Sequence, residues 1–290
     1  MSIKRIIGCL LVRRGIVVQS LGFERYLPVG RPEISARFFD EWGVDETMLL
    51  DIEASRQGRL IDLGLVGRVS NASFAPVAVG GGIRGTDDIR AVLEAGADKI
   101  CVNRLAADDL DMISEASRLF GAQCIIASVD VRKTDGGDYK VFTDGGGNDL
   151  DVHPAQYAKR LADAGAGEIL LTSIDRDGTR QGYDLDLIEQ VAPEVEIPVI
   201  VCGGAGHPDH MKAALALESV SAVAAANFLH HSEHSISVLK SWLRNEDANV
   251  RGEHHALYRN FTFSDDARVL KLSDADLSEQ VFEFVEDDLA

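Results

Sequence analysis

The sequence has no long hydrophobic run, few cysteines, few aromatic residues and a shortage of positive charge. No apolar stretch approaches the roughly 18 residues that span a bilayer, so no transmembrane helix is expected. The N-terminus runs from Met1 directly into a strand-like segment and offers no cleavage signal. All four cysteines lie in apolar, strand-like runs, which favours buried thiols in a reducing compartment: Cys9, Cys101, Cys124 and Cys202. These absences predict a cytoplasmic protein.

The charge balance and the missing motifs exclude further classes of function. With 47 acidic and 29 basic residues the net charge is −18, and such a surface repels nucleic acid and anionic membranes. The chain contains no nucleophile elbow, P-loop or Rossmann fingerprint. The histidines between His230 and His234 have no cysteines or carboxylates at ligand spacing, so they predict a solvated helix start. We therefore expect no metal and no cofactor.

What the sequence does contain is a regular alternation of apolar runs and amphipathic helical stretches. Eight strands alternating with eight helices predict an α/β fold of the (β/α)8, or TIM barrel, type; the alternative is an open doubly wound sheet. The predicted strands lie near residues 5–12, 47–52, 76–81, 99–103, 124–131, 168–174, 198–203 and 221–226. The predicted helices lie near residues 32–43, 57–71, 86–96, 107–119, 153–165, 183–192, 207–217 and 232–245.

The two halves of the chain resemble each other. Leu49–Gly58 resembles Leu171–Gly182, and Val79–Gly82 resembles Val201–Gly204, in both cases about 120 residues further on. This repeat predicts a barrel built from two similar half-barrels, together with a ligand that presents two similar ends. An open sheet would not require such matching halves.

Three segments lie outside the regular repeat. Long connections at residues 13–31 and 132–152 follow the first and fifth strands, where lids and substrate contacts occur in this fold. The repeat stops near residue 247, which predicts a barrel domain at 1–247 and an acidic C-terminal extension at 248–290. In the extension we expect one short strand and one short helix.

Glycines at the ends of matching strands predict two phosphate sites. Backbone N–H groups at strand ends and helix N-termini are fixed donors that bind phosphate. A single Gly-Gly pair is also explained by a tight turn, but two pairs at matching repeat positions are more specific. The first predicted site comprises Gly81, Gly82 and Asn103, and the second comprises Gly203, Gly204, Ala226 and Asn227.

Carboxylates near the ends of three strands add candidate chemistry. Asp130 ends the fifth strand, where partial burial can raise its pKa toward acid–base values, and we predict that it is catalytic. Asp51 ends the second strand and Asp177-Gly178 follows the sixth, and these are predicted to contact the ligand. The alternative is that the carboxylates only cap loops. Leu11 occupies the repeat position that matches Asp130, so the sequence lacks a carboxylate pair.

Charged residues also stand at the opposite ends of the predicted strands. Two positive and two negative side chains precede or begin strands one, two, four and six, where mutual pairing makes buried charge tolerable: Arg5, Glu46, Lys99 and Glu168. From their spacing alone, a structural ring of salt bridges is the ordinary interpretation.

Six motifs narrow the interpretation: Lys4–Ile7, Leu50–Ile52, Val79–Ile83, Ala97–Lys99, Gly165–Thr179 and Gly203–Gly206. Up to about residue 247, the combination resembles the HisF-type cyclase subunit of imidazole glycerol phosphate synthase. The resemblance implies a doubled barrel that binds a substrate with two phosphates. It also implies that ammonia from a HisH-type glutaminase partner enters through the bottom of the barrel, past a charged gate. The four charged residues named above match that gate.

Three departures from the family's pattern affect the chemistry. Leu11 stands where the family has an aspartate in strand one. Gln19 replaces a lysine that contacts substrate in the family, and Arg104 replaces a small hydroxyl residue. The stretches around Asp51–Arg59 and Gly182–Leu185 resemble instead a paralogous branch found with surface-polysaccharide genes. That resemblance implies ammonia supply to a separate sugar amidotransferase that makes acetamidino sugars.

Three functions follow from these features. The first is an ammonia-channelling, cyclase-like subunit for sugar amidination, with weak or absent cyclase activity. The second is a working cyclase, a lyase of histidine biosynthesis, that uses another group beside Asp130. The third is a non-catalytic scaffold that activates the glutaminase.

Overall fold

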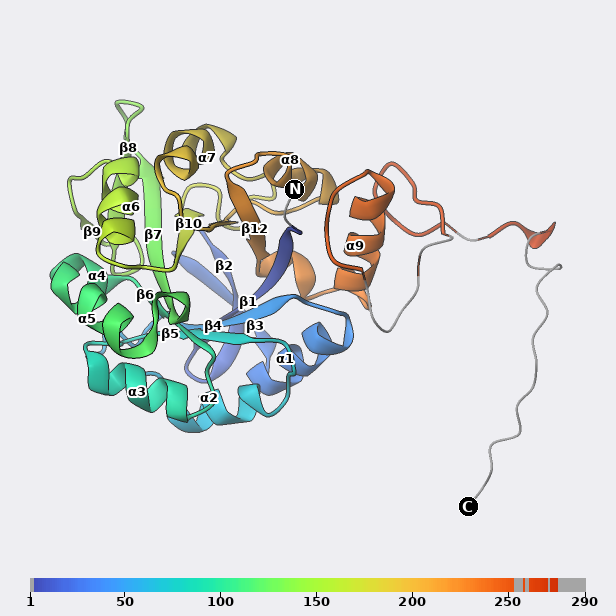
Figure 1. Ribbon diagram of the computed structural model, residues 1–290. Coiled ribbons are helices and arrows are strands. Elements are labelled where there is room, and N and C mark those ends of the chain that lie inside the picture. The colour runs from blue at the N-terminus through green and yellow to red at the C-terminus, as the bar shows by residue number, and fades with distance from the viewer. Residues whose placement is uncertain (1–2, 253–257, 259–260, 271, 276–290) are drawn as a thin grey trace, which may run out of the picture.

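Eight parallel strands form a closed barrel in the computed structural model, which describes residues 3–252, 258, 261–270 and 272–275 (Figure 1). The barrel strands are β1 (Arg5–Arg13), β4 (Glu46–Asp51), β5 (Val77–Gly80), β6 (Lys99–Val102), β7 (Ile125–Lys133), β10 (Glu168–Ser173), β11 (Val199–Cys202) and β12 (Val220–Ala225). Pairing runs unbroken round the ring, including β7 with β10, and the two half-barrels meet where β12 pairs with β1 and where β6 pairs with β7. The predicted (β/α)8 barrel is confirmed.

Helices surround the barrel, and local capping fixes where several of them begin. They are α1 (Pro32–Glu41), α2 (Leu63–Ser70), α3 (Thr86–Glu94), α4 (Arg104–Asp108), α5 (Leu110–Phe120), α6 (Pro154–Asp163), α7 (Leu185–Val191), α8 (Pro208–Leu215) and α9 (Ser235–Asn245). The predicted helix at 57–71 is wrong in its first turn and a half. Asp51 binds the amides of Glu53 and Ala54 in a loop, and the helix starts only after Asp62, which caps Gly64. The predicted helix at 107–119 is two helices, because the side chain of Asp109 caps the start of α5.

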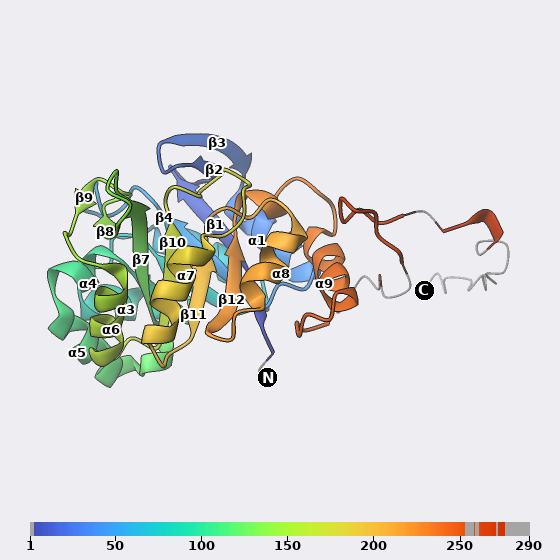
Figure 2. The same ribbon diagram turned by 90° about the horizontal axis from the view of Figure 1, so that it is seen from above.

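The two long connections each form a β-hairpin. After β1 the chain makes β2 (Ile16–Leu21) and β3 (Arg25–Gly30), and after β7 it makes β8 (Tyr139–Thr143) and β9 (Asn148–Asp149). Both hairpins lie at the C-terminal ends of the barrel strands, away from the N-terminus (Figure 2).

The core has two layers. The larger lies between the barrel and the helices and is rich in valine, isoleucine and leucine. The smaller fills the inside of the barrel and comprises Ile7, Cys9, Met48, Ala78, Cys101, Ile126, Leu170, Ile200, Ala222 and Ala224. Inward side chains of a TIM barrel stack in layers, so this inner cluster separates the two ends of the barrel.

Strand register confirms that the halves repeat. Leu11 pairs with Leu50 between β1 and β4, and Asp130 pairs with Thr172 between the matching strands β7 and β10. Leu11 and Asp130 therefore occupy equivalent positions in the two half-barrels.

Beyond α9 the chain returns to the N-terminal end of the barrel. Lys4 and Val250 form a parallel bridge, and the Lys4 amide donates to the carbonyl of Asn249 at 2.9 Å. Phe263 and Val269 form a short antiparallel bridge. Residues 276–290, which carry much of the predicted acidic extension, lie outside the described residues. Within the described part of the chain, no helix is long and apolar enough to cross a membrane.

Candidate functional site

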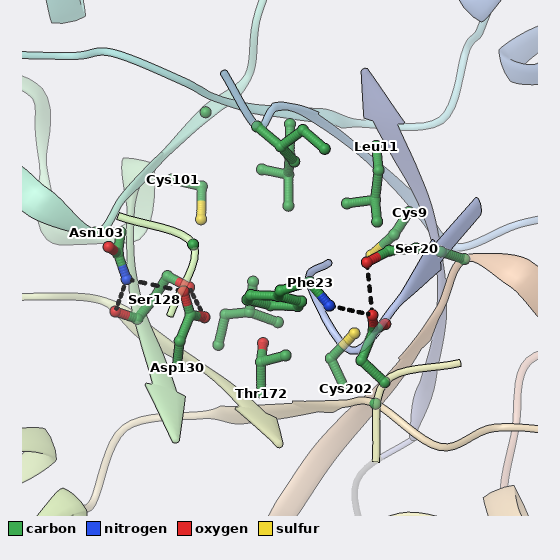
Figure 3. A pocket seen from close by; sticks show the side chains of 18 of the residues that line it. Cys9, Leu11, Ser20, Phe23, Cys101, Asn103, Ser128, Asp130, Thr172 and Cys202 are labelled. Atoms are coloured by element: carbon green, nitrogen blue, oxygen red, sulfur yellow. Dashed lines mark hydrogen bonds between the residues drawn. The ribbon is translucent and has the colours of Figure 1, made fainter. Parts of the chain in front are cut away.

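All the residues predicted for catalysis or ligand contact line one pocket at the C-terminal mouth of the barrel (Figure 3). They are Asp51, Gly81, Gly82, Asn103, Asp130, Asp177, Gly178, Gly203, Gly204, Ala226 and Asn227. The pocket also reaches Cys9, Cys101 and Leu170 of the inner core. The fold thus brings both predicted phosphate sites and the candidate catalytic carboxylate to one cavity.

Asp130 is the carboxylate best placed for acid–base chemistry. Its two oxygens accept hydrogen bonds from the Ser128 hydroxyl at 3.1 Å and from the Asn103 amide at 3.2 Å. Burial raises the pKa of Asp130 to about 7; the Ser128 hydrogen bond opposes this shift and the charge of Asp177 adds to it. A carboxyl that titrates near neutrality can both give and take a proton.

Leu11 lies across the pocket from Asp130, as Figure 3 shows. Its alkyl side chain has no ionisable proton, so Leu11 cannot act as a partner of Asp130 in acid–base chemistry. Asp51 is engaged elsewhere, because both its oxygens bind the Arg59 guanidinium, at 2.7 and 3.2 Å. Asp51 therefore fixes the loop after β4, as the loop-capping alternative predicted.

Asp177 fastens the hairpin β2–β3 over the mouth. Its carboxylate accepts hydrogen bonds from the Ser20 hydroxyl at 2.6 Å and from the Phe23 amide at 3.3 Å. Burial raises the pKa of Asp177, although the bonds from Ser20 and from the amides of Phe23 and Gly22 oppose that shift. Oδ2 of Asp177, which accepts both bonds, therefore holds the hairpin in place.

The four paired glycines are required by the backbone itself. Gly82 and Gly204 have φ of +70° and +100°, and a Cβ would lie 1.8 Å from the Arg59 carbonyl oxygen and 2.1 Å from that of Gly182. Gly81 and Gly203 also have positive φ, and a Cβ there would lie 2.8 Å from the Asp51 carbonyl oxygen and 2.6 Å from that of Ser173. Tight turns thus account for glycine at these positions, while the bare backbone still leaves room for an anion in the pocket.

The four charged residues at the other end form a closed ring of ion pairs, which we call the charged ring. Arg5 contacts Glu46 at 3.0 Å and Glu168 at 2.6 Å, and Lys99 contacts the same two carboxylates at 2.9 and 2.6 Å. Burial raises the pKa of Glu46, although the charge and the hydrogen bond of Lys99 act to lower it. Burial also opposes ionisation of Glu168, but the hydrogen bonds and charges of Arg5 and Lys99 together lower its pKa. The ring narrows the N-terminal end of the barrel, below the inner core.

One oxygen of the charged ring has no partner among the described residues. Oε1 of Glu46 is buried and accepts no hydrogen bond from this part of the chain, although the Glu46 side chain is only 3% exposed. A buried acceptor without a donor costs free energy, so this atom favours a donor that enters the ring.

Sequence comparison places most of the chain in a known family. Residues 5–235 match the family described as histidine biosynthesis protein. The chain belongs to this family. A protein of Vibrio vulnificus (strain YJ016), provisionally named imidazole glycerol phosphate synthase subunit hisF2, is 42% identical over 257 residues. The match covers 89% of this chain and 94% of that protein, so the chain is a HisF-type, cyclase-like subunit.

Several residues of this HisF-like site were missed by sequence reasoning. Ser128 stands two residues before Asp130 on the same face of β7, and the period of two in a strand could have identified it. Thr172 lines the pocket beside Asp130 and could have been found from the strand register. Ser20 and the turn at Asp144 reach the pocket through the hairpins; the sequence predicted substrate contacts in both connections but did not single out these residues.

Proposed function

We propose that this HisF-like chain accepts ammonia from a glutaminase partner at the N-terminal face of its barrel and delivers it for amidination of a surface-polysaccharide sugar. Its own cyclase activity is weak or absent. The observation that carries the proposal is the contrast between the barrel's two ends: the charged ring is complete, whereas Asp130 faces Leu11 across the mouth.

The charged ring is suited to pass a small polar molecule. Ammonia can donate to the unpartnered oxygen of Glu46 and can displace one of the two lysine contacts for a moment. Beyond the ring, the inner core presents small or polarisable side chains such as Ala78, Ala222 and Cys9, which accommodate neutral ammonia but not ammonium. Delivery of ammonia rather than ammonium preserves its nucleophilicity.

The weak cyclase activity follows from Leu11. A positioned acid or base contributes roughly 10²–10⁴-fold to the rate, and leucine supplies neither. Gln19, which replaces a lysine of the family's pattern, donates to the Asn227 carbonyl at 3.4 Å and carries no charge for a phosphate. The number in the name of the Vibrio relative is consistent with a paralogue of the histidine enzyme.

A second candidate is the cyclase reaction of histidine biosynthesis. It is favoured by the pKa of Asp130, about 7, in a pocket with two glycine sites for phosphates. In that case Asp130 would serve as acid and base in turn.

Growth of a histidine auxotroph that lacks the cyclase separates the two candidates. We expect no growth with the wild-type chain; growth that disappears with Asp130→Asn would establish the cyclase instead.

The ammonia route is tested in a complex reconstituted with the glutaminase. Lys99→Ala opens one side of the charged ring, and we expect more glutamine-derived ammonia to escape into solution for each glutamine hydrolysed. The matched control is Lys159→Ala, an exposed lysine of α6. Equal leakage from wild type and from both variants would refute passage through the ring.

A further inference from the structure

The two hairpins at the mouth are each fastened to the opposite half-barrel. The hairpin β2–β3 is bound by Asp177 after β10 and by Asn227 after β12; Asn227 donates to the Ser20 carbonyl at 2.6 Å and accepts from its amide at 3.1 Å. The turn between β8 and β9 is bound by Arg56 after β4 and by Arg104 after β6. Both half-barrels therefore hold the hairpin of the other half. The groups that do so differ: a carboxylate and an amide bind β2–β3, and two guanidinium groups bind the β8–β9 turn.

The contacts of the β8–β9 turn are made by guanidinium groups. Arg104 donates to the carboxylate of Asp144 at 2.7 Å and to that of Asp108 at 3.2 Å. Arg56 donates to the backbone carbonyls of Asp144, at 2.8 Å, and Gly145, at 3.2 Å. The turn therefore depends on backbone contacts through Arg56, whereas Arg104 holds only the side chain of Asp144.

Asp144 resembles an anion that occupies a binding site. It lines the mouth pocket together with Arg56 and Arg104, and its second oxygen, Oδ1, is buried and accepts no hydrogen bond from any residue that the structure describes. Arg104 directly follows Asn103 and also lines a second cavity with Gly82. An anionic group held at Gly81 and Gly82 therefore lies beside the guanidinium that Asp144 now engages.

We propose that Arg104 selects ligands with a dianionic group, such as a phosphate monoester, at the Gly81–Gly82 end of the pocket. Asp144 occupies Arg104 until the ligand displaces it. The proposal rests on the proposed function only in taking the mouth pocket as the place where a ligand binds; the ammonia route itself requires no phosphate. Arg104 then gives the Gly81–Gly82 end of the pocket a charged contact, whereas the Gly203–Gly204 end offers the neutral amide of Asn227.

The energetics allow this exchange. The Arg104 and Asp144 side chains are 48% and 19% exposed, and ion pairs of that kind contribute little in water. A phosphate dianion carries more charge than a carboxylate and accepts two parallel bonds from a guanidinium. Arg104 keeps Asp108 as its second partner, so it stays oriented during the exchange.

Binding of inorganic phosphate, followed by NMR shifts of the Gly82 and Gly204 amides at constant ionic strength, tests the proposal. Arg104→Ser is expected to weaken binding at Gly82 by at least about tenfold, as for loss of a charge-assisted bond. Asp144→Asn is expected to strengthen it about two- to fivefold, the worth of an exposed ion pair. Asparagine suits the left-handed backbone at this position, where φ is +54°, so the turn is retained. The control is Arg118→Ser, an exposed arginine of α5.

Opposite signs for the two variants are the decisive result. If Arg104 served only to hold the turn, Asp144→Asn would weaken binding just as Arg104→Ser does, and the proposal would be overturned. Phosphate shifts at Gly204 but none at Gly82 in the wild-type chain would also overturn it while leaving the proposed function in place. Shifts at neither glycine would also overturn the proposal, whereas the ammonia route through the charged ring would still be judged by the leakage experiment.

Discussion

Asp130→Asn should raise the free energy of unfolding above that of the wild-type chain, and by more near neutral pH than in acid. The carboxyl of Asp130 has an ordinary pKa of 3.8 when unfolded and about 7 when folded, because burial disfavours its charged form. Between these values the folded state binds more protons than the unfolded state. The contribution of Asp130 to the free energy of unfolding therefore falls as pH rises from about 4 to 7 and is level above that. Asparagine removes this dependence.

The size of the effect follows from the shift. One pKa unit corresponds to about 1.4 kcal/mol, so a shift of about three units sets an upper limit of about 4 kcal/mol. Asp130 is only partly buried and lines an open mouth, so solvent screening reduces the expected gain to about 1–2 kcal/mol. Ser128 can reverse its hydroxyl and accept a bond from the new amide, which limits the loss of contacts.

Urea unfolding at pH 4.5 and pH 8 measures the effect, and carbon-13 NMR of the Asp130 carboxyl gives its pKa directly. The control is Asp135→Asn, which removes the same charge from an exposed turn. A difference between Asp130→Asn and wild type that stays constant with pH, together with a carboxyl that titrates near 4, would refute the reasoning from burial.

Three further predictions concern other parts of the barrel. Leu11→Asp should raise cyclase turnover from ammonia by roughly 10²–10⁴-fold, measured with the purified chain, whereas Leu11→Asn should not. Gly204→Ala should lower the unfolding free energy by about 2 kcal/mol or more, because its Cβ meets a carbonyl oxygen; Gly85→Ala, whose Cβ meets nothing, should cost less than about 1 kcal/mol. Lys240→Met removes the nearer charge partner of the buried Asp45 carboxylate, 2.9 Å away, leaves only Arg251 at 3.8 Å among the described residues, and should cost about 3 kcal/mol in urea unfolding. Adding Asp45→Asn should recover part of that loss.

The barrel could be predicted from the sequence because the patterns that indicate its strands and turns are local and occur in both halves of the chain. Each strand is a short, largely apolar run, and the glycines at the ends of β5 and β11 mark the same turn twice. The equivalence of Leu11 and Asp130 could be predicted for the same reason, and the strand register confirms it.

Contacts that depend on distant loops could not be predicted. Arg104 was visible only as a departure from a family pattern, and nothing in its neighbourhood indicates Asp144 forty residues later. The late start of α2 was missed because amphipathic spacing continues through residues 57–62, whereas Asp51 draws the backbone into a loop. In both cases a long-range or capping contact overrides the local pattern.

The cross-fastening of the hairpins also has a consequence for how the molecule assembles and opens. Neither hairpin has its attachment points until the other half-barrel is in place, so we expect the mouth to become ordered after the barrel strands during folding. The same contacts are the first to open in the native state, because they involve few buried apolar groups. Hydrogen exchange should therefore be faster in β2–β3 and β8–β9 than in the barrel strands. The mouth can then open without loss of the barrel or the charged ring.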